Sequence, residues 1–139
     1  MKLFVPKETK PYEKRVALTP DVVKTLIKAG FEIEIESGAG LNSNFTDDAY
    51  VQSGARINNT KDTGYSTADV VLKVNAPTVE EISLMKSGAV LISFLYAYNN
   101  APLVDICIAK GITTFAMDAV PRISRAQKMD ALSSQANLA

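Results

Sequence analysis

Short apolar runs alternate with helical segments along this chain, and the alternation predicts an α/β fold. Two of the runs, residues 69–74 and 89–95, are apolar at almost every position, which is typical of strands buried on both faces of a parallel sheet. We expect strands at 2–6, 31–36, 69–74, 89–95 and 113–117, and helices at 19–30, 46–54, 79–86, 101–111 and 124–139. With right-handed crossovers, the pattern predicts a single domain, residues 1–139, built on a doubly wound, mostly parallel five-stranded sheet. Helices on both faces would make it a Rossmann-like or flavodoxin-like lobe.

Local signals support two of these assignments and predict one loop. Residues 19–30 begin with Thr19 as a suitable N-cap, continue with Pro20 at the first helical position and end at a glycine. The run "FEIEIE" at 31–36 alternates strictly, which predicts a strand with one face in water. The polar stretch "NNTKDTGYST" at 58–67 predicts a surface loop.

Charge and hydropathy restrict the possible partners. The chain has 15 basic and 15 acidic side chains in 139 residues, so its formal charge is zero. Without a basic field it has little attraction for a nucleic acid backbone or an anionic membrane surface. Its apolar runs are far shorter than the roughly 20 residues that span a bilayer, and its first residues do not resemble a signal peptide. We expect a soluble chain without direct membrane insertion.

The inventory of reactive side chains is narrow. The sequence contains no histidine, which removes most zinc sites, every catalytic triad with a histidine base and the commonest general acid–base. The single cysteine, Cys107, lies in an apolar run and cannot form an internal disulfide. We expect it to be a buried, inert thiol, which fits a reducing compartment.

Two basic residues stand where ligands bind in folds of this kind, beyond the carboxyl ends of the strands. Lys73 interrupts an apolar strand near its end, so its ammonium must reach solvent, a carboxylate or a ligand. Arg15 lies on the connection that follows the first strand, where it is either a solvated loop charge or a second residue of the same crevice. The sequence alone leaves these alternatives open.

A glycine-rich stretch, "SGAGLNSNF" at 37–45, follows a predicted strand as a dinucleotide-binding loop would. However, Ser43 occupies the third glycine position of G-x-G-x-x-G, and no long apolar helix follows. We therefore interpret it as a glycine-rich turn.

The last stretch, residues 121–139, is rich in polar groups of fixed geometry. On a helix, Met129, Leu132, Ala136 and Ala139 would form one apolar face, and Gln127, Asp130, Ser134 and Asn137 another face, with Ser133 at its margin. An ion pair between Arg122 and Asp130 would rigidify the preceding loop and leave Gln127 to donate and accept hydrogen bonds toward a neutral polar ligand. An amphipathic helix with one wet face is the alternative.

Four motifs together resemble the alanine dehydrogenase and pyridine nucleotide transhydrogenase family over the whole chain. They are "VPKETKPYEKRVALTP", "ESGAG", "ADVVLKV" and "AMDAVPRISRAQKMDALSSQANLA". The first three are similar in both branches of the family, and the last resembles the signature of the alpha subunit of proton-translocating NAD(P) transhydrogenases. In the alanine dehydrogenase branch, residues matching Arg15 and Lys73 hold the substrate and a histidine follows. Tyr96 occupies that histidine position here, and because a phenol titrates about three units above neutral pH, the departure argues against amino-acid oxidation.

The transhydrogenase resemblance implies another chemistry. Hydride would pass directly from NADH to NADP+ in a Re/Si-specific reaction, with NAD(H) between two lobes of the alpha subunit, NADP(H) on the beta subunit, and a membrane domain coupling the transfer to proton translocation. The resemblance implies that Arg122, Gln127 and Asp130 position the nicotinamide and that Ser133 binds its carboxamide, with Arg15 and Lys73 as additional cleft residues. It also implies a cytoplasmic location at the inner membrane or on the matrix side, and a homodimer at full length.

The glycine fingerprint of the second, NAD-binding lobe does not occur in these 139 residues. We therefore expect the chain to be a fragment that is inactive alone and binds NAD(H) weakly or not at all. The alternatives are a lobe of an alanine-dehydrogenase-like, NAD-dependent amino-acid oxidoreductase and a non-catalytic interaction domain.

Overall fold

The computed structural model describes residues 1–119. The predicted helix at 124–139 and the predicted site residues Arg122, Gln127, Asp130 and Ser133 lie outside the described residues. In chain order the elements are β1 (Lys2–Val5), α1 (Pro20–Lys28), β2 (Glu32–Glu36), η1 (Leu41–Ser43), α2 (Asp47–Gln52), β3 (Arg56–Asn58), α3 (Lys61–Thr67), β4 (Val70–Leu72), α4 (Val79–Leu84), β5 (Val90–Ser93), α5 (Ala101–Lys110), β6 (Thr113–Ala116) and η2 (Met117–Ala119).

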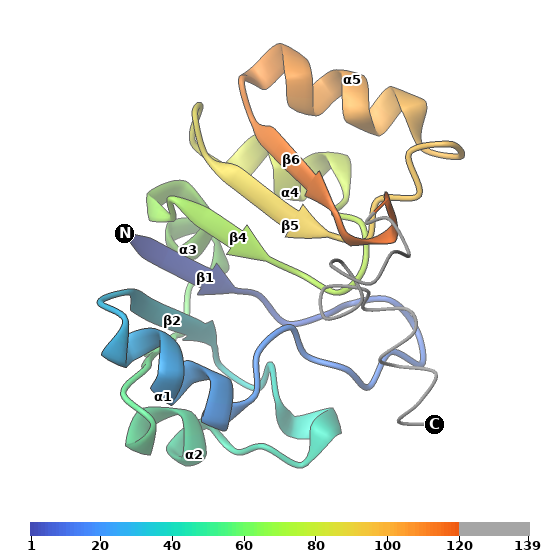
Figure 1. Ribbon diagram of the computed structural model, residues 1–139. Helices are drawn as coiled ribbons and strands as arrows, with labels where there is room; N and C mark the ends of the chain where they lie inside the picture. The colour runs from blue at the N-terminus through green and yellow to red at the C-terminus, as the bar shows by residue number, and fades with distance from the viewer. Residues whose placement is uncertain (120–139) are drawn as a thin grey trace, which may run out of the picture.

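The described strands form one six-stranded sheet in the order β3-β2-β1-β4-β5-β6, and every pairing is parallel (Figure 1). Side chains alternate between its two faces. Leu3 and Val5 of β1 join a core with α1 and α2, whereas Phe4 between them joins a second core with α3, α4 and α5. The predicted doubly wound α/β fold is confirmed, with six strands instead of five.

The strand order reverses direction between β1 and β4. The chain leaves β1 toward α1 on one face and leaves β4 toward α4 on the other, so the two connections diverge at the carboxyl ends of these neighbouring strands. Open α/β sheets bind their ligands at such a switch point, because no crossover covers it. The fold thereby selects the loops that follow β1 and β4 as the place to look for a site.

The surface loop predicted at 58–67 is wrong, because the structure contains the end of β3 and the whole of α3 there. Asn, Thr, Gly and Ser are poor helix formers, so tertiary contacts determine this helix. The ring of Tyr65 packs edge-on against Phe4 at 5.2 Å between centroids. A Cβ at Gly64 would lie 2.4 Å from the Phe4 ring, so only glycine allows this approach.

The wet strand face predicted for 31–36 is also wrong at its centre. Glu34 is buried, its carboxylate lies 3.1 Å from the Lys2 ammonium and it accepts a hydrogen bond from the Asn58 amide. The reason is that β3 makes β2 an interior strand and α3 contacts this part of the sheet. An alternating pattern shows which positions of a strand are polar. It does not show whether those side chains face solvent or are buried and paired with other polar groups.

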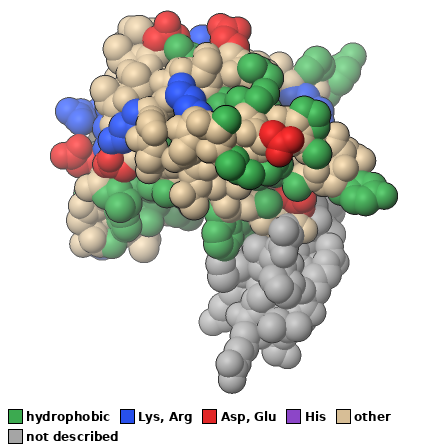
Figure 2. Space-filling view, turned by 90° about the horizontal axis from the view of Figure 1, so that it is seen from above, with side chains coloured by type: hydrophobic (Ala, Val, Ile, Leu, Met, Phe, Trp, Pro, Cys, Tyr) green, Lys and Arg blue, Asp and Glu red, His purple; other side chains and the backbone are tan. Residues whose placement is uncertain are grey.

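Other local predictions hold. Thr19 accepts a hydrogen bond from the backbone N–H of Val22 and begins α1. Cys107 is fully buried on α5, and burial raises the pKa of its thiol, as expected of an inert cysteine. Within residues 1–119 the helices are all too short or too polar to cross a bilayer. The face shown in Figure 2 carries apolar, acidic and basic side chains interspersed.

Candidate functional site

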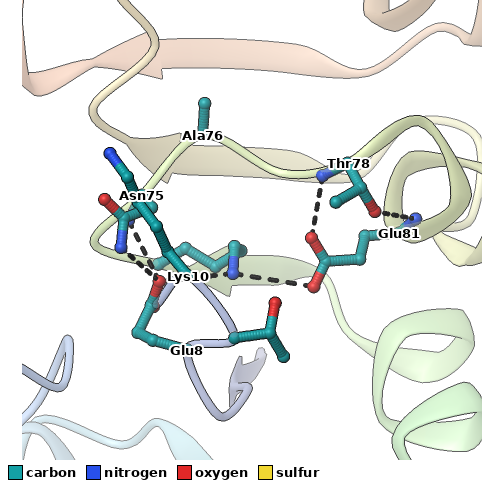
Figure 3. Close-up of a pocket in the computed structure, with 8 residues that line it drawn as sticks. Glu8, Lys10, Asn75, Ala76, Thr78 and Glu81 are labelled. Atoms are coloured by element: carbon teal, nitrogen blue, oxygen red, sulfur yellow. Dashed lines mark hydrogen bonds and ion pairs between the residues drawn. The ribbon is translucent and has the colours of Figure 1, made fainter. Parts of the chain in front are cut away.

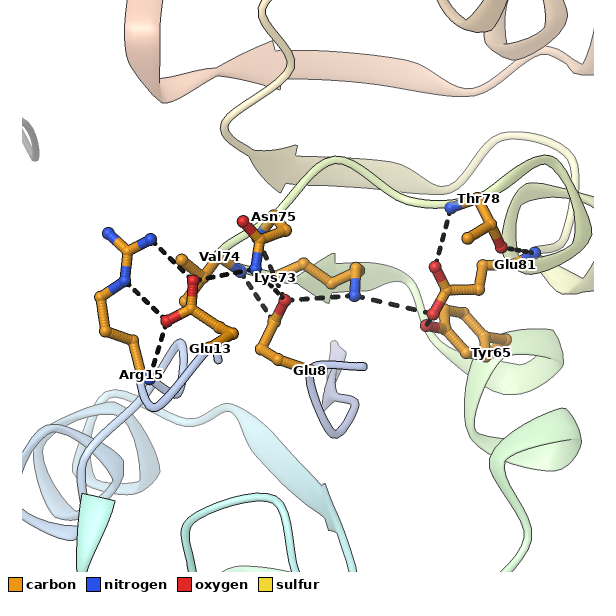
Figure 4. A network of polar contacts seen from close by, with 9 residues as sticks. All are labelled: Glu8, Glu13, Arg15, Tyr65, Lys73, Val74, Asn75, Thr78 and Glu81. Carbon is orange, nitrogen blue, oxygen red and sulfur yellow. Dashed lines mark hydrogen bonds and ion pairs between the residues drawn. The ribbon is translucent and has the colours of Figure 1, made fainter. Parts of the chain in front are cut away.

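Polar side chains meet where the loops after β1 and β4 face each other. Glu8, Glu13 and Arg15 come from the first loop, and Lys73 and Asn75 come from the second; we call these five residues the β1–β4 site (Figure 4). A pocket of about 250 Å³ opens beside it. Its lining, drawn in Figure 3, consists of Glu8, Thr9, Lys10, Lys73, Asn75, Ala76, Thr78 and Glu81.

Lys73 is the central cation of this site. Its side chain is only 2% exposed, with Nζ 3.4 Å from Glu8 Oε1 and 3.6 Å from Glu81 Oε2. The sequence left solvent, a carboxylate or a ligand as possible partners of Lys73. The structure shows carboxylates, so the alternative in which the ammonium reaches solvent is wrong. A buried ammonium requires such partners, because an unpaired charge is expensive to bury.

Glu8 joins the two loops. One carboxylate oxygen accepts from the backbone N–H of Val74 at 2.9 Å, and the other accepts from the backbone N–H of Asn75 at 3.1 Å. The same carboxylate faces Lys73, so it holds the chain where it leaves β4. The sequence gives no indication of this role for Glu8, because one charge in a loop with several charged residues carries no signal of its distant partners.

Glu13 holds Arg15 in a two-point hydrogen bond. Arg15 Nε donates to one oxygen of Glu13 at 2.9 Å, and Nη2 donates to the other at 2.8 Å. These bonds, helped by the Arg15 backbone N–H and by Asn75, outweigh burial and lower the pKa of Glu13 to about 2. Arg15 is about half exposed, and its pairing with Glu13 raises its own pKa.

The side-chain amide of Asn75 connects the two ion pairs. Its Nδ2 donates to Glu13 Oε1 at 3.0 Å and to Glu8 Oε1 at 3.3 Å. A continuous chain of polar contacts therefore runs from Arg15 through Asn75 to Lys73 (Figure 4). Arg15 and Lys73, the two site residues predicted within 1–119, belong to one network.

Glu81 completes the network on the α4 side. Its carboxylate accepts from the Thr78 backbone N–H at 2.8 Å and from the Tyr65 hydroxyl at 2.7 Å, and the Thr78 side chain in turn caps α4. Burial alone would raise the pKa of Glu81, but Lys73 and the hydrogen bonds from Thr78 and Tyr65 outweigh it, so the pKa is lowered. The pKa of Tyr65 is raised, mainly by burial of its hydroxyl and next by the negative charge of Glu81.

The glycine-rich stretch after β2 has a structural explanation. The carboxylate of Asp47 accepts from the backbone N–H of Gly38 at 2.9 Å and from the Ser37 hydroxyl at 2.7 Å. A Cβ at Gly40 would lie 2.6 Å from the Tyr50 ring and 2.8 Å from the Phe45 carbonyl oxygen. The glycines thus allow a tight turn. Asp47 accepts the hydrogen bond of the Gly38 N–H, which would otherwise be available to a phosphate. The interpretation as a turn is confirmed.

The chemistry of the β1–β4 site is that of rigid positioning. Both cations face carboxylates of the same chain, and Glu13 and Glu81 are held ionised, so neither stores a proton near neutral pH. No group of three or more metal-ligating side chains lies within the described part of the chain. The site supplies a fixed, polar and nearly neutral wall to the pocket.

Comparison with known proteins points to one family. The family model described as "Alanine dehydrogenase/PNT, N-terminal domain" matches residues 4–139. The chain is 49% identical over 144 residues to an NAD(P) transhydrogenase alpha subunit of Rhodospirillum rubrum, in a match that covers 100% of this chain and 38% of that protein. It is 47% identical over 138 residues to NAD(P) transhydrogenase subunit alpha of Haemophilus influenzae, in a match that covers 99% of this chain and 27% of that protein. The chain thus spans well under half the length of these relatives.

Two solved structures are similar to the fold. The transhydrogenase from Sinorhizobium meliloti matches with a TM-score of 0.94 and 46% identity over 99% of this chain and 41% of that chain. An L-alanine dehydrogenase matches with a TM-score of 0.84 and 32% identity over 91% of this chain and 34% of that chain. Identity and TM-score are both higher for the transhydrogenase than for the alanine dehydrogenase. This agrees with the transhydrogenase branch, which the motif at the end of the sequence resembles.

Proposed function

This chain belongs to the family of alanine dehydrogenase/PNT N-terminal domains, and from that membership we propose that it is the N-terminal lobe of an NAD(P) transhydrogenase alpha subunit. The complete protein transfers hydride between NADH and NADP+ and couples the transfer to proton translocation. The role of this lobe, residues 1–139, is to position the nicotinamide of NAD(H). A second lobe, outside this sequence, supplies the phosphate-binding loop.

The observation that carries the proposal is the state of the β1–β4 site. Direct hydride transfer between two nicotinamides needs alignment of the two rings and no protein acid or base. Amino-acid oxidation needs a general base that takes up a proton near neutral pH, but the chain has no histidine, and the lowered pKa values of Glu13 and Glu81 make their carboxylates weak bases. Paired, rigid side chains suit the first reaction and not the second.

The described residues fit the nicotinamide end of a dinucleotide better than its pyrophosphate. The pocket wall combines Asn75 and Thr78 with internally paired charges, whereas the glycine turn is occupied by Asp47. The nicotinamide supplies the hydride chemistry when NAD(H) is bound, and this chain orients the ring and its carboxamide. We propose Arg122, Gln127 and Asp130 for the orientation, Ser133 for the carboxamide, and Arg15 and Lys73 for the adjoining wall.

The proposal includes the partners of the complete protein. These are the second lobe, a beta subunit that binds NADP(H), a membrane domain and a second copy of the alpha subunit. The lobe itself would be peripheral to the membrane, on the cytoplasmic or matrix side.

A coupled assay on the full-length protein, reconstituted with its partner subunit, tests the proposal. We expect NADH-dependent reduction of an NADP+ analogue and no alanine-dependent formation of NADH. Gln127→Asn should slow the hydride transfer, because the shorter amide withdraws from its ligand. Alanine-dependent NADH formation would instead support the alanine dehydrogenase alternative, which the shared positions Arg15 and Lys73 favour, and an unchanged rate for Gln127→Asn would favour a non-catalytic role.

A further inference from the structure

A strained tyrosine, Tyr96, lies three residues beyond the end of β5. Tyr96 has a backbone φ of +48°, in the left-handed region that glycine and asparagine adopt most easily. A bulky side chain there costs about 1 kcal/mol or more. Tyr96 is also 45% exposed, so burial of its ring in the core does not explain why the chain carries it.

Asp118, on η2 directly after the neighbouring strand β6, holds this conformation. Its carboxylate accepts from the backbone N–H of Leu95 at 2.8 Å and from that of Tyr96 at 3.0 Å. On the other side of the turn, the Tyr96 carbonyl accepts from the Asn99 N–H at 2.8 Å, and the Leu95 carbonyl accepts from the Asn100 amide at 2.7 Å. Bonds on both sides thus fix the turn, as expected where strain is retained for a purpose.

The Tyr96 side chain belongs to the same end of the sheet as the β1–β4 site. Arg15 follows β1 and Tyr96 follows β5, and β4 lies between these two strands. After Glu13, the interaction with Tyr96 also raises the pKa of Arg15, in agreement with the position of both residues at this end of the sheet. The Tyr96 ring stacks on Phe94, with centroids 6.0 Å apart and planes at 18°.

A half-exposed phenol offers a flat aromatic face and a hydroxyl that both donates and accepts. This combination suits a planar heteroaromatic ring with a carboxamide, and the aromatic face also attracts the positively charged ring of an oxidised nicotinamide. Resting on the proposed function, we propose that Tyr96 contacts the nicotinamide of bound NAD(H) and that Asp118 is the positioning residue that holds Tyr96 in place.

The test uses the full-length assembly and two matched variants. Tyr12 also has a positive φ, at +66°, and is 99% exposed. Tyr96→Asn and Tyr12→Asn both relieve left-handed strain, so neither should lower the unfolding temperature. Only Tyr96→Asn should lower kcat for hydride transfer, by about tenfold or more, and weaken NADH binding, whereas Tyr96→Phe keeps the ring and most of the rate.

Asp118→Asn tests the positioning role. It should slow transfer in the wild-type background, because its NH2 group opposes one of the two backbone N–H donors. In the Tyr96→Asn background it should have little further effect, because Asp118 acts through Tyr96. An equal loss in both backgrounds overturns the positioning role, and an unchanged kcat for Tyr96→Asn in an active assembly overturns the contact. Absence of hydride transfer in the wild-type assembly would overturn the proposed function instead.

Discussion

Lys73 and Glu8 are 65 residues apart in the sequence, yet Nζ of one lies 3.4 Å from Oε1 of the other, and both side chains are at most 3% exposed. Parallel pairing of β1 with β4 brings the two together. Glu81 faces the same ammonium from α4. Lys73, Glu8 and Glu81 thus form a buried triad that joins the β1–β4 site to α4.

Replacing Lys73 with methionine should destabilise the chain by about 3–5 kcal/mol, because Glu8 and Glu81 would remain buried without a cation. Urea denaturation at neutral pH measures the loss. The matched control is Lys86→Met, since the Lys86–Asp69 pair at 2.6 Å has both side chains about 40% exposed, and its loss should change the free energy of unfolding far less. Equal losses in the two variants would mean that burial of the triad adds nothing.

The Glu13–Arg15 pair should make stability depend on pH in the acid range. The pKa of Glu13 is lowered from 4.5 to about 2, so the stabilisation is complete above pH 4.5 and disappears as the pH falls through about 2. The free energy of unfolding of Glu13→Gln should therefore differ most from wild type above pH 4.5. The difference should shrink on acidification, as measured by denaturation between these values.

Arg15 provides the control for that prediction. In an Arg15→Gln background the pKa of Glu13 loses its largest lowering cause, so Glu13→Gln should change little with pH over the same window. A pH dependence that survives the removal of Arg15 would assign the effect to other groups.

Gly64→Ala should destabilise the chain by about 1–3 kcal/mol, because its Cβ would lie 2.4 Å from the Phe4 ring. Ser66→Ala on the exposed side of the same helix should change stability by less than about 0.5 kcal/mol. Adding Phe4→Leu to Gly64→Ala should recover part of the loss by making room. Thermal denaturation of the three variants distinguishes steric conflict from helix propensity, which would make Gly64→Ala stabilising.

Ser93→Ala should not destabilise the chain. Within residues 1–119, Ser93 Oγ is buried at the end of β5 without a hydrogen-bond partner, so its removal relieves a desolvation cost and should add up to about 1 kcal/mol. Ser53→Ala is the control, because Ser53 is also buried but its hydroxyl donates to the Ala49 carbonyl at 2.9 Å. That variant should lose about 1 kcal/mol. A loss of the same size at Ser93 would reveal a partner for its hydroxyl.

The sequence by itself determined the elements whose signals are local. Continuous apolar runs located β4 and β5, and Thr19 and Pro20 marked the start of α1, because capping and periodicity act over a few residues. Lys73 was conspicuous for the same reason, as one charge in an apolar strand. The family motifs further allowed a proposal for the site that extends beyond the described residues.

Only the tertiary structure decided which partners these residues have. It created α3 from a sequence with weak helix propensity by packing Gly64 and Tyr65 against Phe4, and it buried Glu34 beside Lys2. It also paired Lys73 with Glu8 and closed the turn of Tyr96 with Asp118. Each of these contacts joins segments that are distant in the chain. Local pattern contains no information on such pairs, because the order of strands in the sheet determines which loops meet.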